Sequence, residues 1–170
     1  MPAEPVTRAA VLFVGLGSSH GDDAVGWRVA DALLKTSPEG LMIRKALAPI
    51  DLLDWLEPGT RLLICDGCQG LETGETWRRW TWPDCDVAWK SAVGVHDFTI
   101  PGVLALAEGL GRLSCAPEVW GIEVGACDPA TELNENLATT IGKVRDDVLA
   151  FVESTCKDSL CTKPRSYVRC

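Results

Sequence analysis

A continuous apolar run near the N-terminus, Ala9–Val14, is the feature that most constrains the fold of this chain. A strand with one face in water alternates apolar and polar residues, whereas a strand covered on both faces is apolar throughout. The run leads into Gly15-Leu16-Gly17, and apolar residues with helical spacing follow from near Asp22 to about Lys35. A buried strand, a glycine turn and a helix predict the first unit of a parallel sheet covered by helices.

The rest of the chain continues this alternation of strand and helix patterns. Further strands are predicted at 41–47, 61–65, 75–82 and 119–124, and further helices at 49–56, 101–109 and 133–151. The segment 75–82 carries too many charged side chains for a central strand, so we expect it away from the centre of the sheet. The pattern predicts a three-layer α/β fold, in which helices flank both faces of a mostly parallel, twisted sheet.

One domain accounts for most of the sequence. A chain of 170 residues with 46% hydrophobic and 24% charged residues fits a single hydrophobic core. We expect this domain to span residues 1–153, and the polar, locally basic residues 154–170 to form a flexible tail that contains cysteines.

Charge and hydropathy argue against two classes of partner. The net charge is −8 and no basic stripe occurs, which disfavours nucleic acid or an anionic membrane as the main partner. No apolar run approaches the length of about 20 residues that spans a bilayer, and residues 1–10 lack the pattern of a signal peptide. We therefore expect a cytoplasmic protein, in which most of the 8 cysteines are reduced and buried.

Three polar segments lie on the edge of the predicted sheet where the carboxyl ends of parallel strands meet. The first holds His20, Asp22 and Asp23, the second begins with Asp66, and the third holds His96. Ligands of open α/β sheets bind at this edge. Two carboxylates and one imidazole, from Asp23, Asp66 and His96, suit a divalent transition metal such as nickel or zinc.

Each of these residues also has a purely structural interpretation. Asp22 and Asp23 are favourable in the first turn of a helix, because carboxylates interact well with the positive end of the helix dipole. Asp66 can simply form a turn, and Asp97 beside His96 can either cap the next helix or orient the imidazole. Their shared position at one edge of the sheet is what favours a functional site.

Two rival sites fit parts of the sequence. Gly15-Leu16-Gly17 after a strand is typical of a Rossmann-like dinucleotide-binding module, but Gly21 comes one place late and two carboxylates would repel a pyrophosphate. Cys65-Asp66-Gly67-Cys68 is a Cys-x-x-Cys pair of the thiol redox or zinc type, although it begins inside a strand. The motifs of thermolysin-type zinc proteases and of serine hydrolases, His-Glu-x-x-His and Gly-x-Ser-x-Gly, are absent.

The ordered motifs resemble those of the hydrogenase maturation proteases, bacterial endopeptidases that process hydrogenases. The matching pieces are Gly15-Leu16-Gly17 with Gly21-Asp22-Asp23-Ala24-Val25-Gly26, then Arg28-Val29-Ala30, Leu63-Ile64-Cys65-Asp66, His96-Asp97 leading into Val103-Leu104-Ala105-Leu106-Ala107, and Glu118–Val124. Together they cover roughly residues 10–152, and the Gly-Asp-Asp-x-Val-Gly block after a strand is the most specific of them.

The resemblance implies an activity, a partner and a metal. It implies a metal-dependent endopeptidase that removes the C-terminal extension of a nickel–iron hydrogenase large-subunit precursor after nickel loading. By position, Asp23, Asp66 and His96 would bind the metal and act in catalysis. Nickel would arrive with the precursor substrate, and another divalent metal would suit the same ligands.

The chain departs from the family pattern in its first loop. Family members have Gly-Asn and a longer loop before the acids, whereas Gly17 here is followed by Ser18 in a loop one residue shorter. His20 lies within this loop, which makes His20 and Asp22 additional candidates for ligands or substrate contacts. The altered loop also leaves open a non-catalytic scaffold of hydrogenase assembly, which would bind the precursor without cutting it.

Overall fold

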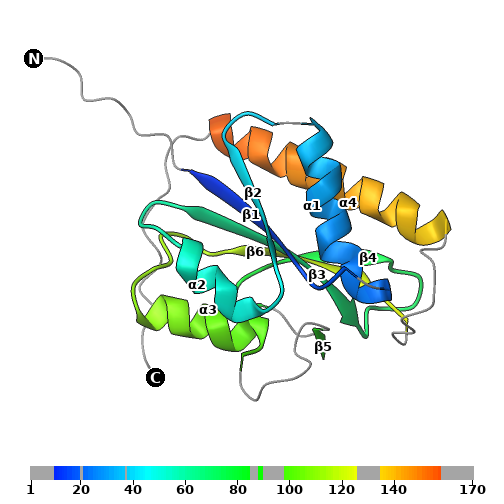
Figure 1. The fold of residues 1–170 in the computed structure, drawn as a ribbon, viewed down its shortest axis with the longest axis horizontal. Coiled ribbons are helices and arrows are strands. Elements are labelled where there is room, and N and C mark those ends of the chain that lie inside the picture. Colours follow the sequence, from blue (N-terminus) through cyan, green and yellow to red (C-terminus); the bar gives the residue numbers. More distant parts are fainter. Residues whose placement is uncertain are drawn as a thin grey trace, which may run out of the picture.

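The computed structural model describes residues 10–19, 21–36, 38–84, 88–89, 98–125 and 135–157 (Figure 1). Within them, one sheet contains β1 (Val11–Leu16), β2 (Leu41–Ala46), β3 (Arg61–Gln69), β4 (Trp77–Thr81), β5 (Ala88–Trp89) and β6 (Glu118–Glu123). The helices are α1 (Val25–Thr36), α2 (Leu52–Trp55), α3 (Ile100–Gly109) and α4 (Glu135–Lys157), with the 3₁₀ turns η1 (Gly21–Ala24) before α1 and η2 (Pro49–Asp51) before α2. None of the described helices is long and apolar enough to cross a membrane.

The sheet is mostly parallel, as the sequence predicts. Its strand order is β2-β1-β3-β6-β4, in which β1 pairs in parallel with β2 and β3, and β3 pairs in parallel with β6. The charged strand β4 pairs antiparallel with β6 at one edge, and the short β5 pairs antiparallel with the end of β3. The predicted fold class and the position of β4 away from the centre are therefore confirmed.

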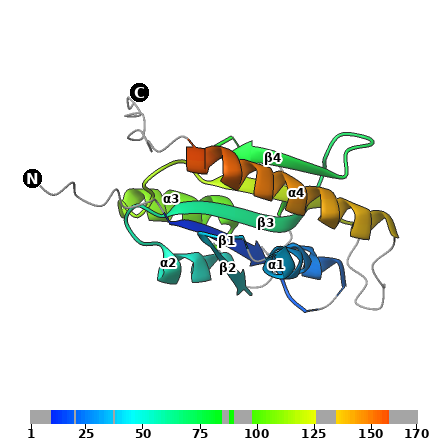
Figure 2. The same cartoon turned by 90° about the horizontal axis from the view of Figure 1, so that it is seen from above.

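Helices cover both faces of the sheet and give the three layers visible in Figures 1 and 2. On one face, α1 and α4 pack over alternate residues of β1 and β3, such as the fully buried Phe13 and Leu63. On the other face, α2 and α3 pack over Leu12 and Ile64. β1 is buried along its whole length, as its unbroken apolar run predicts.

The starts of α1 and α3 differ from the sequence-based prediction. The sequence predicts a first helix that begins near Asp22, whereas the structure has a 3₁₀ turn there and α1 begins at Val25. α3 is capped by Thr99, whose hydroxyl oxygen accepts a hydrogen bond from the Gly102 N–H at 3.1 Å. The capping role considered for Asp97 therefore belongs to Thr99.

Two elements run further than the sequence predicts. β3 continues past Cys65 to Gln69, because its second half pairs with β6 and with β5. α4 continues to Lys157, so the first residues of the predicted tail are helical. Residues 158–170 lie outside the described residues, and the predicted flexibility of the tail stays a prediction.

Glycines let α1 lie close to the backbone of β1 and β3. A Cβ atom on Gly26 would stand 2.2 Å from the carbonyl oxygen of Leu16 and 2.5 Å from that of Cys65. A Cβ atom on Gly15 would stand 2.1 Å from the carbonyl oxygen of Gly26. Both approaches involve backbone atoms, so neither position accepts a side chain unless α1 moves away from the sheet.

A polar network fastens α4 to β4 and β6. Asp147 of α4 accepts hydrogen bonds from the Trp120 indole N–H at 2.9 Å and from the Arg79 guanidinium at 3.2 Å. Glu118 accepts a hydrogen bond from the Thr81 hydroxyl at 3.1 Å, and its carboxylate lies 3.7 Å from the Arg79 guanidinium. Burial nevertheless raises the pKa of Glu118, because the loss of hydration outweighs the effect of these partners.

Gly26→Ala is expected to lower the free energy of unfolding by about 3 kcal/mol, because the added methyl group meets backbone atoms that cannot yield. Gly142→Ala in α4 is the matched control. No atom lies within 4 Å of the position of its Cβ, so alanine should stabilise the helix. Urea titration measures both effects, and equal stability of the two variants would contradict the close approach of α1.

Glu118 is expected to make the protein less stable as the pH rises. Well below the ordinary carboxyl pKa of 4.5, the folded and unfolded states are both protonated and Glu118 carries no penalty. As the pH passes from that value through the raised pKa of the folded state, the unfolded state ionises first and gains stability. Above the raised pKa, the loss of folding stability is complete and constant.

Glu118→Gln removes this ionisation and keeps an acceptor for the Thr81 hydroxyl. Relative to the wild type, its free energy of unfolding should therefore increase between about pH 4 and about pH 7 in urea titrations. The exposed Glu108 of α3 supplies a control, since Glu108→Gln should show no such trend. A Glu118→Gln variant that becomes less stable than the wild type as the pH rises would refute the raised pKa.

Candidate functional site

The sheet has a topological switch point between β1 and β3. From β1 the chain crosses one face through α1 to reach β2, and from β2 it crosses the other face through α2 to reach β3 (Figure 1). Connections that diverge in this way open a crevice at the carboxyl ends of the two strands, where such folds bind their ligands. Asp23 lies shortly after β1, and Asp66 directly follows the part of β3 that pairs with β1, so both belong to this end of the two strands.

Asp66 is a fully buried carboxylate in β3. The expectation that it stands at the tip of the strand is wrong, because the strand continues to Gln69. Ile64 and Cys68, its neighbours on the same face of the strand, belong to the core under α2 and α3. The Gly67 N–H donates a hydrogen bond of 2.8 Å to one of its oxygens. A carboxylate is costly to bury, so a fully buried one beside a crevice is a candidate for function.

Asp23 lies in the turn η1, and its side chain is half-buried. Its carbonyl oxygen accepts a hydrogen bond from the Ser18 N–H at 3.1 Å, which closes the loop after β1. At the start of this loop, Gly17 has a φ of 132°, and a Cβ atom there would stand 1.9 Å from the same carbonyl oxygen. Only glycine fits this turn, which holds Asp23 against the end of β1. A carboxylate here disfavours the pyrophosphate of a dinucleotide.

The turn that carries Asp23 contacts β3, the strand that carries Asp66. Residues near Asp23 and Asp66 in the chain lie close to one another. Gly26 packs against the backbone of Cys65, and a Cβ atom on Gly67 would stand 3.4 Å from a methyl carbon of Val25. The structure therefore brings the segments of both carboxylates together at the β1–β3 crevice, while the roles of the two residues stay predictions.

The remaining candidate ligands cannot be placed in the same way. His20, His96 and Asp97 lie outside the described residues, and for Asp22 only the backbone turn is described. Within the described part of the chain, no group of three or more His, Cys, Asp and Glu side chains is arranged to hold a metal ion. A metal site built on Asp23 and Asp66 would thus take a further ligand from elsewhere, the role that the sequence analysis gives to His96.

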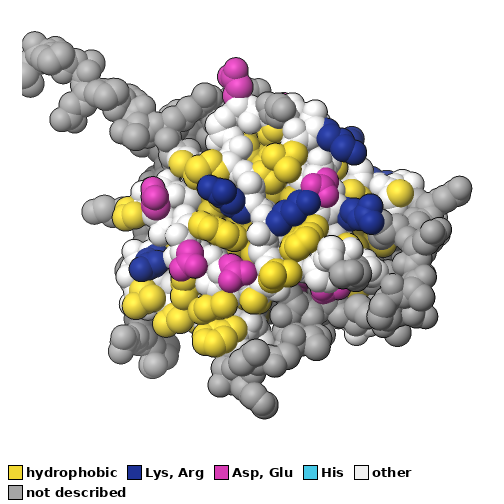
Figure 3. All heavy atoms as spheres, in the orientation of Figure 1, with side chains coloured by type: hydrophobic (Ala, Val, Ile, Leu, Met, Phe, Trp, Pro, Cys, Tyr) yellow, Lys and Arg dark blue, Asp and Glu magenta, His cyan; other side chains and the backbone are white. Residues whose placement is uncertain are grey.

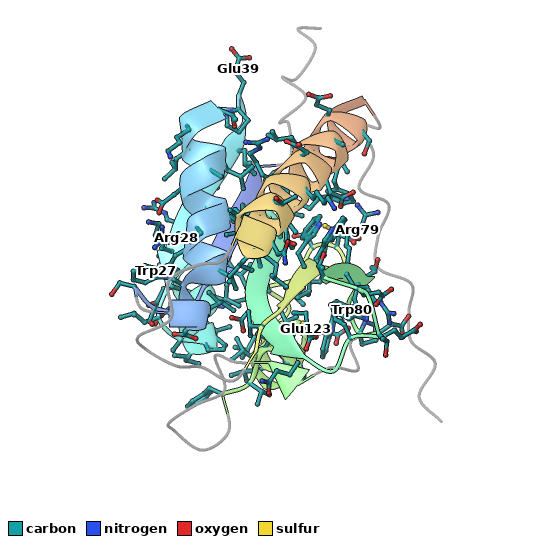
Figure 4. The ribbon with its side chains drawn as sticks, turned by 90° about the vertical axis from the view of Figure 1, so that its right-hand side faces the viewer. Trp27, Arg28, Glu39, Arg79, Trp80 and Glu123 are labelled. Carbon is teal, nitrogen blue, oxygen red and sulfur yellow. The ribbon has the colours of Figure 1, made fainter. Side chains whose placement is uncertain are left out.

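Trp27 of α1 lies at this edge of the sheet (Figure 4). Its indole N–H donates a hydrogen bond of 3.0 Å to the carbonyl oxygen of Ala46, at the end of β2. The same oxygen accepts a hydrogen bond of 3.2 Å from the Gly17 N–H. Trp27 thus ties the loop before Asp23 to β2. The sequence around Trp27 does not predict the hydrogen bond to Ala46, because the two residues are 19 positions apart in the chain.

Glu123 ends β6 at the same edge and organises the chain just after β3. Its two carboxylate oxygens accept hydrogen bonds from the Gly70 N–H at 3.3 Å and the Leu71 N–H at 2.9 Å. It also lines a hollow of about 170 Å³ between the end of β6 and the first turns of α4. A polar residue at the end of a parallel strand is the signal that singled out Asp66, so the same signal could have singled out Glu123.

Cys65 and Cys68 do not form a redox or metal-binding pair. Both are buried and form no disulfide, and they point to opposite faces of β3, Cys65 toward α1 and α4 and Cys68 toward α2 and α3. Burial, and then nearby carboxylates, raise the pKa of both thiols, that of Cys68 to about 12. The expectation of reduced, buried cysteines is confirmed at these two positions.

The fold and its crevice define a class of protein: a doubly wound α/β protein with carboxylates at the β1–β3 switch point. No protein-family model matches the sequence, and no curated protein matches it. Solved structures of hydrogenase maturation proteases do match in fold. The hydrogenase maturating endopeptidase HybD from Escherichia coli aligns with a TM-score of 0.67 and 18% identity, over 86% of this chain and 93% of its own.

Two archaeal proteins extend this likeness. The hydrogenase maturation protease HybD from Thermococcus kodakarensis aligns with a TM-score of 0.64 and 18% identity, over 84% of this chain and 98% of its own. The hydrogenase 2 maturation peptidase from a Thaumarchaeota archaeon aligns with a TM-score of 0.58 and 21% identity, over 84% of this chain and 97% of its own. The protein therefore has the fold of the hydrogenase maturation proteases.

Cys65 and Cys68 are expected to resist alkylation by iodoacetamide in the native protein at about pH 8, because reaction requires an accessible thiolate. Peptide mass analysis after digestion measures the modification, with urea-unfolded protein as the fully reactive reference. The half-buried Cys115 gives a second comparison within the same molecule. Rapid alkylation of Cys68 in the native protein would contradict the raised pKa and would favour the thiol redox or zinc site considered from the sequence.

Proposed function

We propose that this protein is an endopeptidase that removes the C-terminal extension from a nickel–iron hydrogenase large-subunit precursor after nickel loading. The proposal rests on the position of Asp23 and Asp66 at the β1–β3 switch point of a fold shared with hydrogenase maturation proteases. The segments that carry the two carboxylates contact each other, as a common site requires.

The nickel is part of the substrate in this proposal. Two carboxylates and an imidazole, from Asp23, Asp66 and His96, suit a nickel ion with open coordination positions. Nickel bound in the precursor would polarise a carbonyl group and lower the pKa of a bound water. His20 and Asp22 are additional candidates for contacts with the substrate, since they belong to the same loop.

The two carboxylates have different surroundings and therefore different proposed roles. Asp66 lies in a central strand, and the Gly67 N–H holds one of its oxygens, so it offers a ligand in a fixed position. Asp23 is half-buried and stands in the turn η1 before α1, so water can reach its carboxylate. Asp23 is thus the better placed of the two to accept a proton from the attacking water.

A requirement for nickel would make cleavage a check on assembly. An empty precursor would lack the ion that bridges it to the carboxylates and the imidazole, and its peptide bond would not be positioned. Precursor without nickel is therefore expected to stay intact in the presence of the wild-type protein.

Asp23→Asn, Asp66→Asn and His96→Ala are each expected to slow cleavage of the nickel-loaded precursor by at least about 100-fold. Asparagine preserves the side-chain volume, and at position 66 it retains an acceptor for the Gly67 N–H. Asp54→Asn, at an exposed carboxylate of α2, is the matched control and should cleave at the wild-type rate. Intact mass analysis of the precursor detects the loss of its C-terminal peptide.

The results of this experiment test the assignment of the site residues and the protease activity separately. Wild-type rates in all three variants would rule out this site. Stable binding of the loaded precursor by the wild type, with no loss of mass, would favour the non-catalytic scaffold. Circular dichroism of each variant establishes that a lost activity reflects chemistry and not unfolding.

A further inference from the structure

One side of the molecule, formed by α1 and the edge strand β2, combines cations with exposed apolar side chains. Figure 3 views this side, where Lys and Arg side chains lie among apolar ones, together with some Asp and Glu side chains. We call it the α1–β2 face and define it by six exposed side chains from α1, β2 and the residue after β2: Arg28, Leu34, Lys35, Met42, Arg44 and Leu47.

The apolar members of the α1–β2 face are open to solvent. Leu47 is 68% exposed, Leu34 51% and Met42 45%. Single exposed apolar residues are common, but a group of them on one side of a protein marks an interaction surface. Leu34 also borders a hollow of about 630 Å³ between α1 and α4, which Ile141 lines from the other helix. A partner side chain can enter this hollow.

The cations of the face have no ion-pair partner among the described residues. Arg28, Lys35 and Arg44 form no salt bridge there, whereas Arg78 and Arg79 on the opposite edge strand each pair with two carboxylates. Arg79 thereby joins β4 to α4, and none of the three cations of the α1–β2 face joins two elements by an ion pair among the described residues. The cations of the α1–β2 face remain available to another molecule.

α1 and β2 together contain one carboxylate, that of Asp31. Asp31 of α1 pairs with Lys45 of β2 at 2.5 Å, and the Lys45 ammonium lies 5.4 Å from the centre of the Trp27 ring. Within α1 and β2 themselves, the four cations Arg28, Lys35, Arg44 and Lys45 thus outnumber the one carboxylate, on a protein whose net charge is −8.

We propose that the α1–β2 face docks an acidic and apolar surface of the protein substrate, the hydrogenase large-subunit precursor, an inference that rests on the proposed function. Charge complementarity selects this occupant, because a positive face attracts an acidic partner and repels the same face of a second copy. Arginine and Met, mixed with other apolar side chains, are also the composition that protein–protein interfaces favour.

The α1–β2 face is continuous with the candidate site. Leu47 directly follows Ala46, whose carbonyl oxygen accepts hydrogen bonds from the Gly17 N–H and the Trp27 indole N–H. Gly17 begins the loop that leads to Asp23. A precursor that covers this face therefore lies beside the edge where its C-terminal extension has to reach the carboxylates.

Edge strands also carry cations as protection against pairing with other chains. That role accounts for Arg44, but it requires neither exposed Met42 and Leu47 nor cations on α1. The two roles differ in their consequences, since protection of an edge limits self-association and docking sets the affinity for the precursor.

The test is the kinetics of precursor cleavage by charge-reversal variants of the face. Lys35→Glu and Arg44→Glu should each raise KM about three-fold, and about ten-fold together, with kcat unchanged, because contacts at the rim of an interface become repulsive. Lys143→Glu, at an exposed lysine of α4 outside the face, is the matched control and should keep the wild-type KM. About 0.5 M salt should shrink the differences, since it screens surface charges.

The outcomes keep this proposal apart from the proposed function. A wild-type KM in the double variant at low salt would overturn the docking proposal and leave the protease intact. A wild type that binds the precursor without cutting it, and loses that binding in the double variant, would support docking and refute the protease. A wild type that neither binds nor cleaves the precursor overturns both. Each variant should melt within about 3 °C of the wild type, so that a change in KM reports on docking.

Discussion

The close approach of α1 to the backbone of β1 and β3 is the constraint on which the rest of this structure depends. Gly26 and Gly15 remove the side chains that would hold the helix away from the sheet, and Gly17 allows the tight loop that joins β1 to η1. Because these contacts join backbone to backbone, they leave little freedom in the position of the helix start. The carboxylate of Asp23 is carried on that start, so the packing of three glycines determines where a functional group stands.

β3 carries both a buried carboxylate and residues of the apolar core. Asp66 lies between Ile64 and Cys68 on the face under α2 and α3, at the place where the connections of the sheet diverge. A carboxylate in this position costs stability, and proteins keep such groups where chemistry or binding uses them. Its field also adds to the effect of burial in raising the pKa of Cys65 and Cys68.

The two edges of the sheet use charge in opposite ways. At the β4 edge, Arg79 forms ion pairs with Glu118 and Asp147, and the second pair joins the strand to α4. At the β2 edge, Arg44 lies without an ion pair among the described residues, beside exposed apolar side chains. One edge is thus completed by the protein itself, and the other is the surface that we propose for the substrate.

The sequence by itself determined the layers of this protein, since a strand that helices cover on both faces has to be apolar throughout, as Val11–Leu16 is. It also determined the displacement of the charged strand from the centre, and it singled out Asp23 and Asp66 as carboxylates that follow buried apolar runs. Only the tertiary structure decided the strand order, the extension of β3 to Gln69 and the contact of Trp27 with Ala46. These features arise from pairing between segments far apart in the chain, which no local pattern records.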